Sequence, residues 1–70
     1  MKIRYDSEVD TLSIMFTNTT VTTQNIIEGI AVDFDSEGHI AAIELLDAIK
    51  RFGNKQIFDK IELEQLSFAH

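Results

Sequence analysis

The feature that most constrains this chain is the alternation of apolar and polar residues over most of its first 46 positions. Ile3 and Tyr5 alternate with three charged residues, and the same pattern recurs over residues 12–16. A period of two is typical of strands that bury one face, because successive side chains point to opposite faces of a sheet. The two segments are joined by a polar turn over residues 7–9, Ser-Glu-Val, and predict a β-hairpin.

Three more strands are predicted from the same alternation and from β-branched residues. The Thr- and Val-rich residues 21–26 suit a pleated surface better than a helix. A fourth strand is expected over about residues 28–33, where Gly29 indicates a bulge or bend, and a fifth over residues 40–46. Residues 2–46 are therefore predicted to form a small antiparallel β-meander of about five strands within an α+β domain.

The turn before the fifth strand predicts a register. Residues 35–38, Asp-Ser-Glu-Gly, are typical of a type I turn followed by a glycine bulge, with Gly38 where φ must be positive. The expected pairs are Asp35 with His39, Phe34 with Ile40, Val32 with Ala42, and Ile30 with Glu44. Glu44 would then lie on an apolar face, where a carboxylate is costly unless Arg4, Lys2 or a partner chain meets it.

In this register the opposite face is apolar as well. It would hold Asp33, Ala31, Ala41, Ile43 and Leu45. Each apolar face has to be shielded from water by another segment or another chain. One cover is expected to be the C-terminal segment, residues 47–70, and the other a second copy of the chain.

The C-terminal segment is predicted to be helical at first. Asp47 is expected to cap a short helix through Phe52, with Gly53 as its left-handed stop, and Asn54 offers a second cap. The stripe formed by Ile57, Phe58, Ile61, Leu63, Leu66 and Phe68 fits core packing or, alternatively, partner binding. Residues 61–68 leave two structures open, namely a short helix followed by a sixth, edge strand or one longer helix.

Seventy residues form a single small domain, residues 1–70, with a thin margin of stability. The chain has no cysteine, so neither a disulfide nor a thiolate zinc site can reinforce it. Self-association is the remaining inexpensive reinforcement, and we expect a homodimer. The N-terminus has no signal-peptide pattern and no apolar run approaches the roughly 20 residues that span a bilayer, which predicts a soluble, cytoplasmic protein.

The formal net charge is −6, from twelve acidic and six basic side chains. A surface of this sign repels phosphate backbones and anionic lipids, so neither nucleic acid nor membrane is expected as a partner. It would attract a basic protein partner, although an acidic surface also serves solubility alone.

Residues 33–44, DFDSEGHIAAIE, match the calcium-loop template D-x-[DN]-x-[DN]-G-x5-E with Glu in its fifth position. A strand pattern precedes the loop where an EF-hand has a helix. In a tight hairpin, Glu44 would also lie about 15 Å from the turn. The alternatives are an acidic turn or a divalent-ion site at Asp33, Asp35 and Glu37.

Enzyme chemistry has little support in the sequence. His39 and His70 have no ligand or base partner at suitable spacing, and the serines lie in no nucleophile motif. A small hydrolase using Asp33, Asp35 and Glu44 is the weakest alternative, and no cofactor is expected. Asp6 and Asp10 bracket the first turn, where we expect their carboxylates to accept backbone hydrogen bonds.

Several of these residues together resemble a family of short bacterial and archaeal proteins, domain-of-unknown-function family 2283. The resemblance covers about residues 2–51. It rests on residues 2–6, on Asp10 with Leu12 and Ile14, on Gly29 with Ile30, Val32, Asp33, Asp35 and Gly38, and on residues 43–48. The chain departs from the family pattern at Ala42 and Ile49, where members have Gly and Ser.

The resemblance implies a small antiparallel meander and no established activity. Members are sometimes encoded beside small toxin-like proteins, which would suit an antitoxin-like binding role. The favoured hypothesis is a non-enzymatic protein-interaction module, with ion binding and hydrolysis as alternatives.

Overall fold

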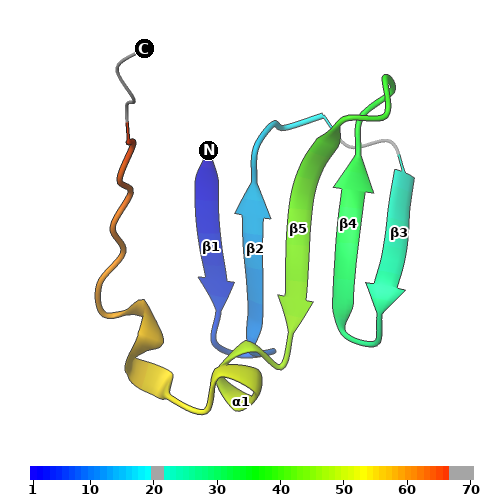
Figure 1. Cartoon of the computed structure of the whole chain (residues 1–70). Helices are drawn as coiled ribbons and strands as arrows, with labels where there is room; N and C mark the ends of the chain where they lie inside the picture. Colours follow the sequence, from blue (N-terminus) through cyan, green and yellow to red (C-terminus); the bar gives the residue numbers. More distant parts are fainter. Residues whose placement is uncertain (20–21, 67–70) are drawn as a thin grey trace.

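The computed structural model describes residues 1–19 and 22–66. In that part of the chain it has five strands, one short α-helix and one 3-10 helix (Figure 1). Their bounds are β1 (Lys2–Asp6), β2 (Thr11–Met15), β3 (Thr22–Ile27), β4 (Ile30–Phe34), β5 (Ile40–Leu46), α1 (Ala48–Phe52) and η1 (Lys55–Phe58). Each strand begins within two residues of its predicted start, with position 21 outside the described residues. No helix in the described part is long and apolar enough to cross a membrane.

The strands form one antiparallel sheet, which confirms the α+β class and the five-stranded architecture. Their order is β1-β2-β5-β4-β3, so the chain order is kept within the β1–β2 hairpin and within β3–β4–β5 (Figure 1). β5 lies at the centre, between β2 and β4. β1 and β3 are therefore the two edge strands.

The hairpin between β4 and β5 has the predicted turn. Gly38 has a φ of 84°, its N–H donates to the carbonyl of Asp35 over 3.1 Å, and the N–H of Asp35 donates to the carbonyl of His39 over 2.9 Å. Phe34 lies opposite Ile40, as predicted. The sequence therefore identified the turn type and the first pairs correctly.

Beyond that pair the predicted register is wrong, because β5 carries one extra residue. Asp33 lies opposite Ala42, so Ala41 has no partner on β4 and forms a β-bulge. The carbonyl of Ala41 instead accepts the N–H groups of Phe16 and Thr17, at 2.7 and 3.1 Å. The observed pairs that follow are Val32 with Ile43, Ala31 with Glu44, and Ile30 with Leu45.

The bulge exchanges the faces of β5. Directly opposed residues share a face, so Ile43 and Leu45 lie with Ile30 and Val32, while Glu44 lies on the other side. The large apolar side chains thus lie on one side of the sheet. We call that side the apolar sheet face; it consists of Ile3, Tyr5, Leu12, Ile14, Ile30, Val32, Phe34, Ile40, Ile43 and Leu45. The expectation of two apolar faces, and of an apolar environment for Glu44, is wrong.

Helix α1 begins and ends where predicted but is capped differently. Asp47 occupies the N-cap position with a φ of 54° and makes no side-chain capping hydrogen bond. The carboxylate of Asp10, on the β1–β2 turn, accepts the N–H of Ile49 at 2.8 Å and that of Lys50 at 3.5 Å. An N-cap residue normally has an extended backbone, whereas Asp47 is left-handed, and Asp10 supplies the capping carboxylate instead. Gly53, with a φ of 73°, ends the helix as predicted.

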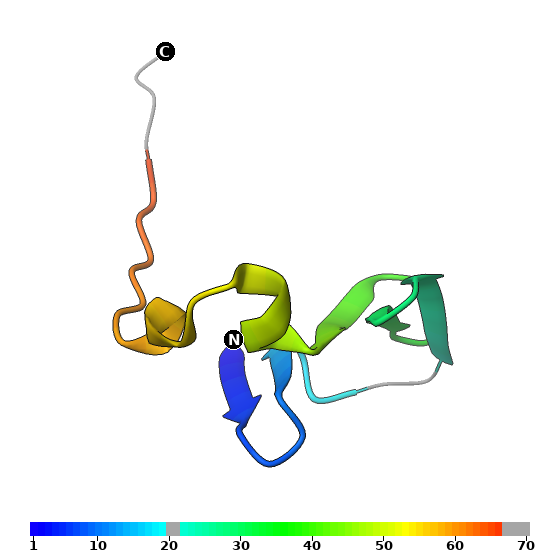
Figure 2. The same cartoon turned by 90° about the horizontal axis from the view of Figure 1, so that it is seen from below.

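Asn54 caps the next element, accepting the N–H of Gln56 over 2.9 Å, but that element is the 3-10 helix η1 and not an α-helix. The ring of Phe58 stacks on Tyr5 at a centroid distance of 4.4 Å, so α1 and η1 lie on the apolar side of the sheet, near β1 (Figure 2). Residues 59–66 follow in neither helix nor strand. They lead away from the sheet (Figure 2), and residues 67 and 68 of the predicted sixth strand lie outside the described residues.

Candidate functional site

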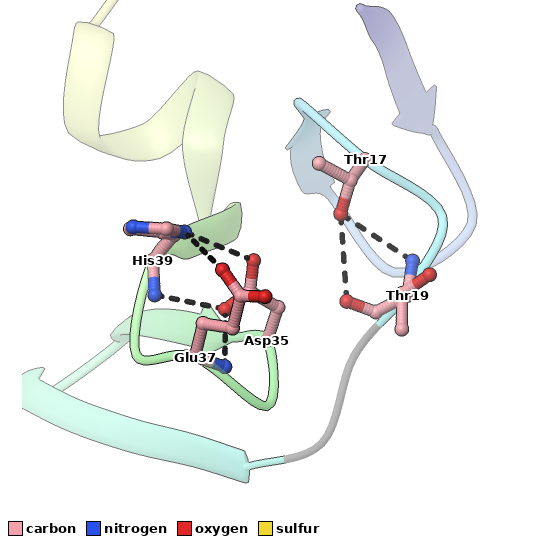
Figure 3. A network of polar contacts seen from close by, with 5 residues as sticks. All are labelled: Thr17, Thr19, Asp35, Glu37 and His39. Carbon is pink, nitrogen blue, oxygen red and sulfur yellow. Dashed lines mark hydrogen bonds and ion pairs between the residues drawn. The ribbon is translucent and has the colours of Figure 1, made fainter.

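The first candidate site is the acidic turn between β4 and β5. The Asp35 carboxylate accepts hydrogen bonds from the backbone of this turn. Oδ1 of Asp35 accepts the N–H groups of Glu37 and His39, both at 2.9 Å. The N–H of His39, and less strongly that of Glu37, lowers the pKa of Asp35. The imidazole of His39 lies 3.6 Å from both carboxylates (Figure 3). A nearby loop is closed in the same local way by Thr17, whose hydroxyl bonds to the backbone of Thr19 (Figure 3).

The Asp33 carboxylate bonds to the neighbouring strand β3 and not to the turn. Asp33 is only 6 % exposed, and its Oδ1 accepts the hydroxyl of Thr23 on β3 at 2.6 Å. Asp33 thus lies on the polar face of the sheet while Asp35 and Glu37 lie around the turn. Among the described residues, no three His, Asp or Glu side chains are grouped so that they could hold a metal ion.

A shallow hollow on the polar face brings together two of the three residues of the hydrolase alternative. Asp33 and Glu44 both line it, on neighbouring strands, and Asp35 does not. The hollow measures about 470 Å³ and is lined by Ser13, Met15, Thr17, Asn18, Thr23, Asp33, Ala42 and Glu44. Glu44 is half-buried between Ser13 and Ala31 in the sheet, so its carboxylate faces a wet surface instead of the expected apolar one.

Asp10 connects the β1–β2 hairpin to α1 through several hydrogen bonds, and the sequence indicated only part of this role. Besides capping α1, its Oδ1 accepts the hydroxyl of Tyr5 at 2.7 Å, and its carbonyl accepts the N–H of Ala48 at 2.9 Å. The N–H of Ile49 and the hydroxyl of Tyr5 lower the pKa of Asp10. Asp6 does accept a turn hydrogen bond, from the N–H of Glu8 at 3.0 Å, as predicted. The position of Asp10 in a turn was visible in the sequence, but its partner 39 positions away was not.

A second contact between distant segments, made by Arg51, was not predicted. Arg51 donates from Nε to the carbonyl of Leu46 at 2.8 Å and from Nη2 to the carbonyl of Glu28 at 2.7 Å. Its guanidinium crosses Gly29, where a Cβ atom would overlap Nη2. The side chain thus connects α1 to the ends of β3 and β5, and nothing in the local sequence signals that contact.

The apolar sheet face is the most unusual surface of the molecule. Among the described residues, only Ala41, Ala42 and Ala48 are buried apolar side chains, and no large side chain is fully buried. The residues of this face are half-buried, except Ile3 and Ile40, which are exposed. η1 covers the face at its β1 end, where Phe58 stacks on Tyr5. A surface that would form the fully buried core of an ordinary domain therefore stays partly accessible to solvent in the described residues.

The chain exposes more surface than a compact domain of its mass. The chain exposes 5884 Å², whereas a compact monomer of 7.9 kDa exposes roughly 4,400 Å². The difference exceeds the roughly 800 Å² that each partner buries in a protein–protein interface of standard size. The chain as a whole thus exposes enough surface for an interface of that size.

One family model matches the chain, that of the proteins of unknown function DUF2283, over residues 2–48. The match covers more than half of the chain and includes all five strands. Neither a curated protein nor a solved structure shows significant similarity to it. The chain belongs to the DUF2283 family, which confirms the resemblance drawn from the sequence.

Proposed function

We propose that this member of the DUF2283 family is a non-enzymatic protein-interaction module whose contact surface is the apolar sheet face. The single observation that carries the proposal is that alanines are the only buried apolar side chains in the described residues. A domain that leaves its largest apolar surface half-open gains stability when a partner covers that surface. Binding is thus the activity that the arrangement of side chains favours.

The partner that fits this surface best is a basic protein with an apolar patch. None of the ten residues of the apolar sheet face is charged, so it can be desolvated at low cost. The chain as a whole has a net charge of −6, which attracts a cationic partner and accelerates its encounter. An antitoxin-like role is one form that such binding could take.

The two alternative functions, ion binding and hydrolysis, have less support. The sequence motif still supports a divalent-ion site. However, Asp33 bonds to Thr23 and Asp35 to the backbone of the turn, so the two carboxylates are not directed at a common point. The hydrolase proposal keeps Asp33 and Glu44 in one hollow but has no third group beside them from its own set. We therefore give binding precedence over both.

The test uses Ile40, which lies opposite Phe34 and is 48 % exposed, so that a substitution leaves the fold intact. The full chain is used to capture a stoichiometric partner from the native cell, and the affinity of the purified partner is then measured. We expect Ile40→Lys to weaken binding at least about tenfold, because it places a cation against an apolar and basic surface.

The matched control is His39→Lys, which adds a cation at the neighbouring turn position. It should change the affinity by less than about threefold. Failure to obtain a stoichiometric partner, or equal loss of affinity in the two variants, would contradict the proposal.

A further inference from the structure

The outer edge of β1 is open, and it carries a specific charge pattern. In the part of the chain that the structure describes, β1 is paired only with β2, so its other side presents unpaired backbone groups that can accept a further strand. Lys2, Arg4 and Asp6 alternate along it and are exposed, and in the described part of the chain none of them forms an ion pair. β3, at the opposite edge, has the sequence TTQNII and no charge.

Residues 60–64 have the matching pattern. Ile61 and Leu63 are 62 % and 86 % exposed and alternate with Lys60, Glu62 and Glu64. Lys60 and Glu62 lie on the same side, with 2.7 Å between Nζ and Oε1, as a backbone with a period of two requires. The segment is thus an exposed chain with the alternation of a strand and no sheet to join.

We infer that residues 60–64 of one copy form a sixth strand on the β1 edge of a second copy, and that the exchange is reciprocal. In one antiparallel register every pair is complementary. That register places Lys60 opposite Asp6, Ile61 opposite Tyr5, Glu62 opposite Arg4, Leu63 opposite Ile3, and Glu64 opposite Lys2. Opposed charges and opposed apolar residues both stabilise neighbouring strands.

The parallel alternative is disfavoured by the same residues. Aligning Ile61 with Ile3 in parallel would place Lys60 opposite Lys2 and Glu64 opposite Asp6, which gives two like-charge pairs. The antiparallel register has none. Reciprocal exchange also closes a two-fold dimer in which neither β1 edge stays open.

The path of the chain favours a second copy over the same copy as the acceptor. Phe58 is stacked over the ring of Tyr5, so the segment starts above the face of β1 and not at its edge. From there it runs beside β1 in one view and away from the sheet in the other (Figures 1 and 2). Only Asp59 separates Phe58 from the segment, and a connection this short favours exchange between copies over folding back. The inference is independent of the partner that the apolar sheet face binds.

Charge reversal tests the exchange on the full chain. One variant carries K2E and R4E and the other E62K and E64K; all four positions are exposed. We expect sedimentation to show the wild type at twice 7.9 kDa. Each variant alone should dissociate at least about tenfold more readily, because two complementary pairs at each of the two exchanged strands become repulsive.

The decisive sample is the equimolar mixture of the two variants. If strands are exchanged, each tail meets an edge of opposite charge on the other variant, and two-chain particles containing one of each return with nearly the wild-type affinity. A mixture that stays dissociated, or a variant that dimerises as well as the wild type by itself, would overturn the inference. Circular dichroism of each variant establishes that it is folded.

A measurement on the wild type covers the case in which a variant does not fold. In a mixture of isotope-labelled and unlabelled chains, filtered nuclear Overhauser spectra should connect Leu63 of one copy to Ile3 of the other. The same contact seen only within a copy would overturn the inference.

Discussion

The hydroxyl of Tyr5 donates a hydrogen bond of 2.7 Å to Oδ1 of Asp10, the carboxylate that also caps α1. This bond links the first strand, the first turn and the C-terminal helix in one network. The hydrogen bond with Asp10 raises the pKa of Tyr5 to about 12. Because the chain has one tyrosine and no tryptophan, the network can be followed by its own optical signal.

The first prediction concerns that signal. Spectrophotometric titration of phenolate absorbance should give one midpoint near 12, above the ordinary value of 10.0. In Asp10→Asn the midpoint should fall toward 10.0, because the hydrogen bond to a carboxylate is lost, together with the negative charge beside the hydroxyl. Asp6→Asn is the control and should move the midpoint much less, since Asp6 is the weakest of its causes. A wild-type midpoint near 10.0 would show that the hydrogen bond does not form in solution.

The second prediction is the pH dependence of stability. The pKa of Asp10 is lowered below its ordinary 3.8 by the N–H of Ile49 and the hydroxyl of Tyr5. The unfolded chain therefore binds more protons in this range, and the stabilisation is complete above 3.8 and lost as the pH falls through the folded-state pKa. Urea unfolding between about pH 5 and pH 2 should show a shallower loss of stability in Asp10→Asn than in the wild type.

The control for this prediction is Glu8→Gln, since the Glu8 carboxylate accepts no hydrogen bond in the described residues. It should keep the slope of the wild type. Equal slopes in Asp10→Asn and the wild type would contradict the capping role of Asp10.

The third prediction concerns the contact between Gly29 and Arg51. Gly29→Ala should lower the free energy of unfolding by roughly 2 to 3 kcal/mol, because φ is 84° and the new Cβ would displace the guanidinium. Arg51→Ala should cost about 1 to 2 kcal/mol through its lost hydrogen bonds to Leu46 and Glu28.

The double variant separates the two effects. Once Arg51 has been removed, the methyl group of Ala at position 29 has space, so the combined loss should be smaller than the two single losses added, by about 1 kcal/mol. Additive losses in denaturant unfolding would indicate that the side chain does not cross Gly29.

The features of the fold that could be predicted are those determined by residues close together in the sequence. Alternation located the five strands, and the Asp-Ser-Glu-Gly turn fixed the pair Phe34–Ile40. The bulge was hidden because Ala41 and Ala42 are adjacent and equally small, so these two positions do not show where the alternation changes phase. Its trace in the sequence was Glu44, which the register without a bulge placed on an apolar face and the bulge moves to the other face.

The contacts that organise the candidate surface were not predictable, because they join distant segments. The pairing of β2 with β5 depends on which edges meet in space, and Asp10 meets α1 across 39 positions. Residues 61–68 left both an edge strand and a longer helix open, and their pattern could not specify a partner strand. For that reason the apolar sheet face became visible only once the strands were placed.

The last prediction tests the register directly by comparing neighbouring positions on β5. Ile43 lies on the apolar sheet face opposite Val32, whereas Glu44 lies on the polar face opposite Ala31. Ile43→Glu should therefore lower the free energy of unfolding by roughly 2 to 3 kcal/mol, because it places a charge among apolar side chains. Glu44→Ile should change it by less than about 1 kcal/mol, since the side chain faces a wet hollow. In the register without a bulge Glu44 would lie on an apolar face, and Glu44→Ile should instead raise the free energy of unfolding by more than about 1 kcal/mol because it removes a charge from apolar surroundings. The denaturant midpoint of Glu44→Ile therefore decides between the two registers.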